Sequence, residues 1–421
     1  MKVLVVGSGG REHAIADTLA QSKSIRKLYV APGNGGMRSI AELLPIAADD
    51  LTGLLDFANR ERIDLTVIGP EVPLSHGIVD LFQKAGRPIV GPTADQARLE
   101  SSKSFAKRFF QTNRIPTAQF QECATFENAL KAVQQSRLPV VIKADGLAAG
   151  KGVTIAETLP AAEETLRQLM VQKSLGDAGR KVVIEEFLVG EEASFMVFAD
   201  GTDFQSMVVA QDHKRRHDGD TGPNTGGMGA YSVDSILSPE LRQRVVESII
   251  RPTLKASKFY SGILYAGLML TADGPKIIEY NVRFGDPETQ VVLPRLKTDL
   301  LQVFMDIADH RLGPRKLEWL PDATATIVLV AGNYPGHVET GKRISGLEDA
   351  SRVPEVKVYH AATRYEDGQY YTAGGRVLNV TARGSSLSEA LDRAYAAAEL
   401  ITFEGKDYRT DIGKKGLART L

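Results

Sequence analysis

Cysteine is nearly absent from this sequence of 421 residues, because Cys123 is the single one. One cysteine can form neither an internal disulfide nor a thiolate zinc cluster, so both are excluded. Net charge is nearly absent too, since 51 Lys and Arg stand against 52 Asp and Glu. A formal net charge of −1 argues against a whole-protein field built for nucleic acid or for anionic membranes. It leaves room for a local basic pocket.

Long hydrophobic runs are also missing. None approaches the ~18 apolar residues of a membrane span. The first apolar run, residues 2–6, ends at Gly7 and continues into a glycine-rich turn. That pattern indicates a first buried strand rather than a signal peptide. We therefore expect a cytoplasmic protein with neither a membrane nor a nucleic-acid partner.

What the sequence does contain is an ordinary globular composition, 43% hydrophobic and 24% charged. Single cores stop growing at ~250–300 residues, so more than one domain is expected. The first hundred residues alternate short apolar runs with helical patterns, which predicts a parallel, doubly wound α/β sheet. Strands are expected at residues 2–6, 28–31, 65–68 and 89–90, and one helix at 77–85.

The pattern is more varied after residue 100. A helix-rich passage is expected at 101–112 and strands at 138–143 and 181–186. Residues 211–231 are polar and glycine-rich, and a loop of this length without secondary structure is usually functional or disordered. Beyond Asp322, short strands and one helix are expected. That helix begins with the capping box Ser386-Leu387-Ser388-Glu389.

The first chemical motif is Gly7-Ser8-Gly9-Gly10-Arg11-Glu12-His13, which follows a strand and opens a helix. Glycine there lets a backbone approach a phosphate, which the helix N-terminus attracts. A dinucleotide fingerprint needs glycine where Glu12 stands, so NAD and FAD are disfavoured. A single phosphate beside Arg11 is one interpretation, and a tight strand–helix turn without a ligand is the other.

A second motif joins the strand-borne Lys143 to a loop that carries Gly146, Gly150, Lys151 and Gly152. The spacing is wrong for a P-loop, and the Ser or Thr that would hold magnesium is missing. The arrangement suits a lid that folds over phosphates. An ordinary hairpin loop would explain the glycines but not a lysine within a buried strand.

The third motif is Glu279-Tyr280-Asn281-Val282-Arg283, which continues an apolar strand. Alternation places Glu279, Asn281 and Arg283 on one face. A carboxylate and an amide oxygen suit a hard cation with oxygen ligands, and the arginine suits a phosphoryl or carboxylate group. The alternative is a solvated polar strand face.

Other candidates carry less weight. The seven histidines show no metal-ligand spacing, and Cys123 has no nucleophile signature. The basic run His213-Lys214-Arg215-Arg216-His217 is either a solvated face or a collector of anionic substrate. Lys414-Lys415 suits a solubilising tail, and residues 413–421 are expected to fray.

Lys143 with its lid, Glu185-Glu186-Phe187-Leu188 and Glu279-Tyr280-Asn281 follow the order of the ATP-grasp superfamily, which the chain resembles. In more detail it resembles the glycinamide ribonucleotide synthetase family, almost end to end. The matching stretches are residues 7–14, 31–36, 69–71, 143–153, 222–231, 283–290 and 408–413. Several of these stretches, 222–231 among them, are long and specific to this family.

The resemblance implies a multidomain fold of α/β and α+β regions. It consists of an N-terminal substrate-binding domain at residues 1–100, an ATP-grasp domain at 101–322 with a mobile lid at about 120–188, and a small mixed β/α domain at 323–421. It implies a ligase that joins glycine to 5-phosphoribosylamine through glycyl phosphate, with ATP and Mg²⁺, or Mn²⁺ in its place. The products are glycinamide ribonucleotide, ADP and phosphate, early in purine synthesis. A monomer or a homodimer is expected.

Site roles follow from the same resemblance, position by position. Catalysis is assigned to Lys143 and Arg283, and the metal to Glu279 and Asn281. The expected ATP-binding residues are Lys103, Lys143, Lys151, Glu185, Glu186, Phe187, Leu188 and Glu192. The expected substrate-binding residues are Gly9, Gly10, Arg11, Asn34, Glu71, Asp212, Asn224 and Arg283.

The number of metal ions and the identity of the reaction stay open. Many ATP-grasp enzymes place a further metal carboxylate in the preceding strand, where this chain has Leu268-Met269-Leu270, so the number of metal ions is undecided. The chain could be another ATP-grasp ligase or carboxylase, acting on bicarbonate or on a different amino acid. A regulatory ATP-binding protein without turnover would not need Lys143, Glu279, Asn281 and Arg283 together.

Overall fold

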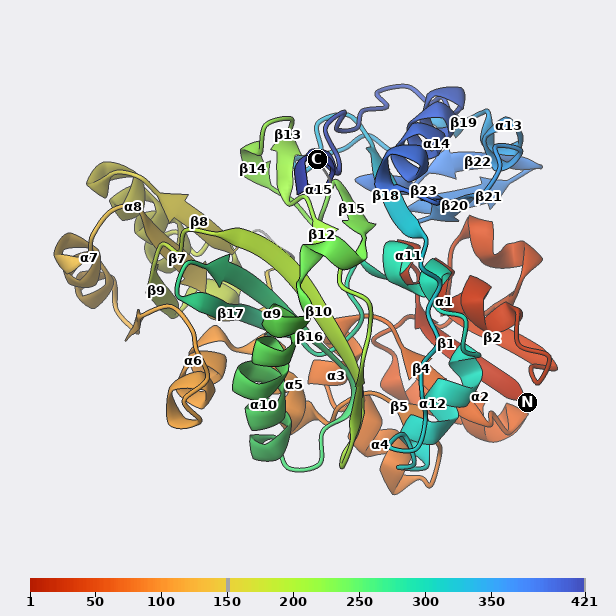
Figure 1. Cartoon of the computed structure of the whole chain (residues 1–421), viewed down its shortest axis with the longest axis horizontal. Helices are drawn as coiled ribbons and strands as arrows, with labels where there is room; N and C mark the ends of the chain where they lie inside the picture. The colour runs from red at the N-terminus through yellow and green to blue at the C-terminus, as the bar shows by residue number, and fades with distance from the viewer. Residues whose placement is uncertain (149–151, 420–421) are drawn as a thin grey trace.

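The computed structural model describes residues 1–148 and 152–419. Figure 1 shows an N-terminal region at the right, a lid region projecting at the left, a central sheet between them, and a C-terminal region above. The expected lysine of the lid loop, Lys151, lies outside the described residues.

The N-terminal region is built on one parallel sheet in the order β3-β2-β1-β4-β5. Its strands are β1 (Lys2–Gly7), β2 (Lys27–Pro32), β3 (Glu42–Leu43), β4 (Leu65–Ile68) and β5 (Ile89–Val90). Its helices are α1 (Gly10–Ala20), α2 (Leu51–Glu61), α3 (Glu71–Ser75) and α4 (Ile78–Lys84). The parallel sheet, four of its strands and the helix expected at 77–85 are confirmed. The two-residue β3 is too short to give a hydrophobic pattern.

Helices α5 (Ala94–Ser101) and α6 (Lys103–Thr112) lead to the lid, a four-stranded antiparallel sheet in the order β6-β9-β7-β8. The strands are β6 (Phe120–Cys123), β7 (Val140–Ala144), β8 (Val153–Ala156) and β9 (Val182–Glu186). Helices α7 (Phe126–Gln135) and α8 (Leu159–Leu166) pack on it and enclose a separate small core. That separate core makes the lid a compact unit of its own.

The central sheet is antiparallel too, in the order β11-β10-β16-β17. Its strands are β10 (Glu191–Asp200), β11 (Phe204–Ser206), β16 (Ser261–Thr271) and β17 (Gly274–Asn281). Helices α9 (Pro239–Val245) and α10 (Arg251–Ala256) precede β16, and α12 (Leu300–Ala308) follows β17 and packs on β10 and β16. Strand β17 carries the third sequence motif directly beside the lid (Figure 1).

The C-terminal sheet has the order β12-β15-β18-β23-β20. It consists of β12 (Gln211–Asp212), β15 (Gly229–Ser232), β18 (Ala323–Val330), β20 (Val356–His360) and β23 (Arg376–Gly384). Between β12 and β15 lies a hairpin of β13 (Arg215–His217) and β14 (Thr221–Asn224). The expectation of a long loop without secondary structure at 211–231 is therefore wrong. This polar segment needs no core of its own, because β15 adds to the buried strand β18.

Two features at the C-terminus differ in outcome. The helix α14 (Leu387–Leu400) and its N-cap are confirmed, because the Ser386 side chain accepts a hydrogen bond from the Glu389 N–H. The Glu389 carboxylate accepts from the N–H and hydroxyl of Ser385, so the second bond of the expected capping box goes to the neighbouring residue. The expected frayed tail is instead the helix α15 (Lys414–Arg419) as far as the structure describes it. Lys415 in this helix forms an ion pair with Asp220, 2.6 Å apart, so it is not a free solubilising residue.

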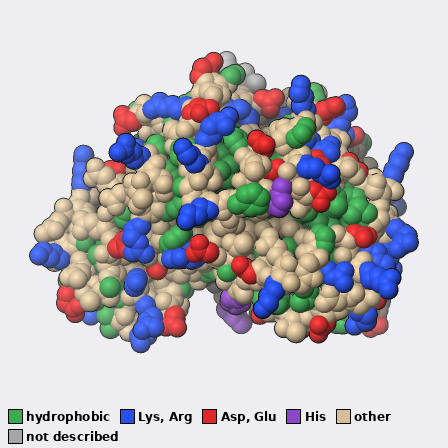
Figure 2. Space-filling model, turned by 90° about the horizontal axis from the view of Figure 1, so that it is seen from below, with side chains coloured by type: hydrophobic (Ala, Val, Ile, Leu, Met, Phe, Trp, Pro, Cys, Tyr) green, Lys and Arg blue, Asp and Glu red, His purple; other side chains and the backbone are tan. Residues whose placement is uncertain are grey.

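Charge is mixed over the surface. On the face in Figure 2, Lys and Arg side chains alternate with Asp and Glu, and no large area carries one sign alone. None of the helices in the described part of the chain has the length and apolar character needed to cross a membrane.

Candidate active site

A cavity of about 700 Å³ lies where the N-terminal region, the lid, the central sheet and the C-terminal region meet. It collects most of the residues expected from the sequence. Those that line it are Arg11, Glu71, Lys103, Lys143, Glu185, Glu186, Phe187, Leu188, Glu192, Asp212, Asn224, Glu279, Asn281 and Arg283. Gly9, Gly10 and Asn34 do not belong to this lining among the described residues.

Strand β17 and its exit supply the polar face that alternation predicts. Glu279, Asn281 and Arg283 all reach the cavity. The Arg283 guanidinium donates to Asn281 Oδ1 at 3.1 Å and to the Phe284 carbonyl at 3.1 Å. Arg283 is thus fixed in direction before any ligand binds.

Two carboxylates of the N-terminal half hold the same arginine. Arg283 Nη2 lies 2.8 Å from Glu100 Oε1, and Nε lies 3.3 Å from Glu71 Oε2. Burial raises the pKa of Glu100, whereas Arg283 and Arg11 outweigh burial at Glu71 and lower its pKa. The carboxylates therefore couple the N-terminal region to the end of β17.

The Glu279 carboxylate stands apart from these pairs. Among the described residues it has neither a hydrogen-bond nor an ion-pair partner, although it lines the cavity. Burial alone would raise its pKa, but Lys103, Lys214, Lys143 and Arg283 lower it below the usual value. Glu279 is therefore ionised at neutral pH and free to take a ligand.

A magnesium ion fits this donor set. The described residues contain no group of three or more His, Cys, Asp or Glu side chains placed to hold a metal. Mg²⁺ does not require one, because it is usually bound by one or two protein oxygens together with water and substrate phosphates. Glu279 and Asn281 supply such oxygens. The carboxylate sought in the preceding strand is absent, since Met269 of β16 lines the cavity there.

Lys143 reaches the cavity from β7 while 3% of its side chain is exposed. Its Nζ lies 3.0 Å from Glu185 Oε1 and donates to the Ile278 carbonyl at 3.2 Å. Glu185 Oε2 accepts a hydrogen bond from Lys107 Nζ at 2.8 Å. Glu185 Oε1 accepts no hydrogen bond in the described part of the chain, and the Lys143 ammonium is its ion-pair partner.

The connection from β9 to β10 forms another wall of the cavity. Phe187 and Val189 line it although they are exposed apolar residues, an arrangement suited to a flat, apolar ligand face. Glu192, at the start of β10, pairs with Lys214 at 2.5 Å. Burial, with Glu288 and Glu192 nearby, raises the pKa of Asp212 to about 7 against the effect of Lys214.

The loop 7–13 uses its glycines for packing. The Gly9 N–H donates to Glu12 Oε2 at 2.6 Å, so this amide is occupied within the protein. A Cβ on Gly10 would come within 2.2 Å of Asn379 Nδ2 from β23. Asn34 donates to the carbonyls of Ser8 and His360, both at 2.8 Å, and so links the same loop to the C-terminal region. Of these expected residues, Arg11 alone reaches the cavity.

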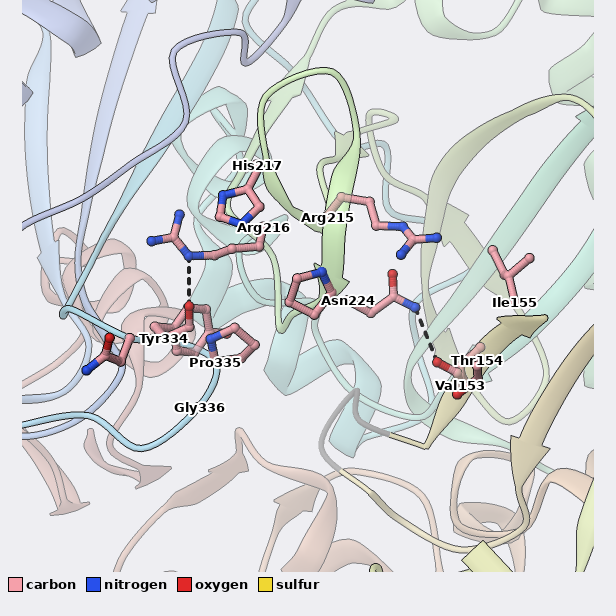
Figure 3. A pocket seen from close by; sticks show the side chains of 12 residues that line it. Val153, Thr154, Ile155, Arg215, Arg216, His217, Asn224, Tyr334, Pro335 and Gly336 are labelled. Carbon is pink, nitrogen blue, oxygen red and sulfur yellow. Dashed lines mark hydrogen bonds between the residues drawn. The ribbon is translucent and has the colours of Figure 1, made fainter. Parts of the chain in front are cut away.

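A second cavity, of about 810 Å³, lies behind the β13–β14 hairpin. Figure 3 shows Arg215, Arg216 and His217 on one side of it and the lid strand β8 and residues 334–336 on others. Asn224 contributes to both cavities and donates to the Val153 carbonyl at 3.5 Å, drawn as a dashed line in Figure 3. Arg216 donates to the Tyr334 carbonyl and to Asp407, so the protein itself holds this guanidinium.

Several lining residues were missed by sequence reasoning. Arg376 of β23 pairs with Asp286 at 3.1 Å. Glu288 accepts hydrogen bonds from Tyr265 at 2.6 Å and from Ser194 at 3.2 Å. All but Ser194 line the cavity. Asp286 and Glu288 could have been found, because they follow Arg283 directly; Arg376 lies far along the chain and carries no local signal.

Comparison with known proteins gives matches over most of the chain. Three family models match in order: the phosphoribosylglycinamide synthetase N domain at residues 1–100, its ATP-grasp (A) domain at 101–289, and its C domain at 324–415. Phosphoribosylamine–glycine ligase of Vibrio vulnificus is 48% identical over 426 residues, covering 100% of this chain and 99% of that protein. The enzyme of the same name from Escherichia coli K12 is also 48% identical, over 427 residues, with 100% and 99% covered.

Solved structures agree in fold. The crystal structure of phosphoribosylamine–glycine ligase from Thermotoga maritima superposes with a TM-score of 0.83 at 34% identity, covering 98% of this chain and 100% of that one. Biotin carboxylase of Campylobacter jejuni gives a TM-score of 0.76 at 14% identity, covering 96% of this chain and 92% of that one, which shows a shared fold alone. The chain therefore belongs to the phosphoribosylglycinamide synthetase family and is an ATP-grasp ligase.

Proposed function

We propose that this chain uses ATP to join glycine to 5-phosphoribosylamine, which yields glycinamide ribonucleotide, ADP and phosphate in purine biosynthesis. Relatives 48% identical over their full length, named phosphoribosylamine–glycine ligase, support the reaction. The observation that carries the proposal is the shared cavity, in which Lys143, Glu279 and Arg283 face Arg11 and Glu71 of the N-terminal region. Such a cavity can bring a nucleotide and a second substrate into contact.

The reaction has two steps, a phosphoryl transfer followed by an acyl transfer. A glycine carboxylate oxygen attacks the γ-phosphorus of ATP, the bond to the bridging oxygen breaks, and ADP leaves with glycyl phosphate formed. The amine of phosphoribosylamine then attacks the acyl carbon, phosphate leaves, and the nitrogen gives up a proton. Phosphoryl transfer needs positioning and charge neutralisation rather than a covalent protein partner.

Lys143 and Lys103 would neutralise ATP phosphates, and Arg283 would face the acyl phosphate. Residues 185–188 would hold adenine, and Glu192 would contact the ribose. Magnesium at Glu279 and Asn281 would supply charge neutralisation at the phosphates. Manganese has the same preference for oxygen ligands and could replace it.

The phosphoribosylamine would lie beside Arg11 and Arg376. Both arginines line the cavity, and guanidinium groups suit a 5′-phosphate. No histidine is among the described residues that line the cavity. This suits a sugar-bound amine, which attacks as its free base without a dedicated protein base.

The proposal also includes domains at residues 1–100, 101–322 and 323–421, with the lid at about 120–188. The separate core of the lid and the limits of the three family models support this division. We further propose a cytoplasmic monomer or homodimer with small-molecule substrates alone. The buried single Cys123 suits a reducing compartment.

A coupled assay of ADP release tests the proposed function. Release should require magnesium, glycine and phosphoribosylamine together, and a panel of other amino acids should not replace glycine. Bicarbonate should not support turnover either. Turnover with bicarbonate or with another amino acid, at a rate equal to that with glycine, would assign the chain to a different ATP-grasp reaction.

A further inference from the structure

Lys107 is a buried lysine that the proposed reaction does not use. Its side chain is 2% exposed, and its Nζ lies 2.8 Å from Glu185 Oε2. The other carboxylate oxygen of Glu185 lies 3.0 Å from Lys143 Nζ. One buried carboxylate thus stands between two buried ammonium groups, of which Lys143 alone reaches the cavity among the described residues.

The three side chains come from three elements: Lys107 from α6, Glu185 from β9 and Lys143 from β7. Lys107 Nζ also lies 2.8 Å from the Thr117 hydroxyl, which donates to the Ile277 carbonyl. Lys143 donates to the next carbonyl of β17, that of Ile278. The network therefore ties the lid sheet to the strand that carries Glu279.

Charge balance gives Lys107 a specific effect. A buried carboxylate paired with Lys143 alone would cancel the charge of that lysine and draw its ammonium toward β9. A second ammonium at Oε2 leaves the trio with one net positive charge. Burial lowers the pKa of Lys107 to about 8 against the opposing effect of Glu185, so the protonated form still predominates at pH 7.

Donor geometry agrees with this balance. A lysine ammonium has three N–H donors. Lys143 directs one at the Ile278 carbonyl and forms an ion pair with Glu185, which leaves a donor for a group in the cavity. An ammonium drawn closer to Glu185 would lose that direction, and a displacement of about 1 Å can cost about 100-fold in rate.

We propose that Lys107 is a positioning residue, which keeps the Lys143 ammonium directed into the cavity by sharing Glu185 with it. This inference rests on the proposed role of Lys143 at the ATP phosphates. A neutral residue at 107 should therefore impair the use of ATP and leave the binding of glycine unchanged.

The test measures kcat, and KM for ATP and for glycine, in Lys107→Met, Lys107→Gln and Lys107→Arg, with urea unfolding of each. Lys107→Gln retains a hydrogen-bond donor toward Glu185 and removes the charge, so it serves if Lys107→Met does not fold. Both neutral variants should lose about 10- to 100-fold in kcat/KM for ATP. KM for glycine should stay within about twofold of the wild-type value, and Lys107→Arg should recover most of the loss.

Two controls separate positioning from structural damage. Arg295→Met removes a buried cation paired with Asp234 outside the cavity, so it should lower the urea midpoint without changing KM for ATP. Lys131→Met removes an exposed charge from α7 of the lid and should change neither quantity. Loss of stability alone would reduce the active fraction and leave both KM values unchanged.

Folded Lys107→Gln with wild-type kcat and KM for ATP would overturn the inference. An equal loss in Lys107→Gln and Lys107→Arg would overturn it too, because the charge would not be the feature that matters. Lys143→Met distinguishes this failure from a failure of the proposed function. Unchanged use of ATP in Lys143→Met would remove Lys143 from the phosphates, whatever Lys107 does.

Discussion

The segment 279–283 and the loop 7–13 both reach the cavity, but they differ in how many polar groups they leave for a ligand. Glu279 has no protein partner in the described structure, whereas the Gly9 N–H and the Arg11 side chain both bind Glu12. Alternating polar residues on a strand that enters a cavity thus indicate ligand contacts more directly than a glycine-rich loop does. A glycine shows only that some group lies close to the backbone, and at Gly10 that group is the Asn379 side chain.

Lys143→Met should have the largest effect of all, because Lys143 lines the cavity together with Glu279. Loss of one cation to a transferring phosphoryl group in a dry site should lower kcat by about 100- to 1,000-fold. The urea midpoint, measured in parallel, should show that the variant still folds. A kcat near the wild-type value would show that Lys143 of β7 does not contact the ATP phosphates. The contrast between the two regions would then fail.

Glu279→Gln should have the next largest effect. The substitution keeps the size of the side chain and removes the one carboxylate proposed for magnesium. The Mg²⁺ concentration for half-maximal activity should rise at least about 10-fold, since even residues behind metal ligands change affinity by about 10- to 100-fold. Titration of activity with Mg²⁺ and with Mn²⁺ measures it. An unchanged metal requirement would place the ion elsewhere.

Gly10→Ala probes the other side of the comparison. Its Cβ would meet Asn379 Nδ2 and Gln290 Nε2 within 3 Å, so the contact between the N-terminal and C-terminal regions must shift. Overpacking of this kind costs about 1–3 kcal/mol in the free energy of unfolding. Denaturant unfolding should detect this loss, while KM for ATP stays unchanged. A selective loss of ATP binding without loss of stability would place the nucleotide at this loop.

Acid should weaken the same contact between the N-terminal and C-terminal regions, to a smaller extent than Gly10→Ala. Burial lowers the pKa of His13 to about 4, and Lys357 adds to the effect. The folded pKa thus lies below the unfolded value of about 6.5, so the unfolded chain binds more protons between these limits. Stability should fall as pH drops from about 6.5 toward 4, by up to about 2 kcal/mol between pH 7 and 5.

Urea unfolding at pH 7 and pH 5 measures this slope, and His13→Asn serves as the matched variant without an imidazole. It should be less stable at pH 7 but show a smaller acid dependence. Equal slopes for the wild type and for His13→Asn would show that the acid response arises from groups other than His13, such as His360, whose pKa burial lowers to about 3.

Local periodicity explains how much of the molecule was predictable. Four strands of the parallel sheet follow from short apolar runs, and the shared face of Glu279, Asn281 and Arg283 follows from alternation within a few residues. The strands β13 and β14 pair with each other, whereas β12 pairs with β15. Strand β15 was missed because its other partner, β18, lies about a hundred residues later. Lys415 was misread as a tail residue for the same reason, since its partner Asp220 lies far away in the sequence.

Oxygen transfer from glycine tests the central claim most directly. Glycine labelled with ¹⁸O in its carboxylate is converted with ATP and phosphoribosylamine, and the released phosphate is analysed by mass spectrometry. Attack of the carboxylate on ATP predicts one ¹⁸O atom in each phosphate released. Phosphate without ¹⁸O, formed at the same rate as the product, would contradict an acyl phosphate and with it the roles given to Lys143, Glu279 and Arg283.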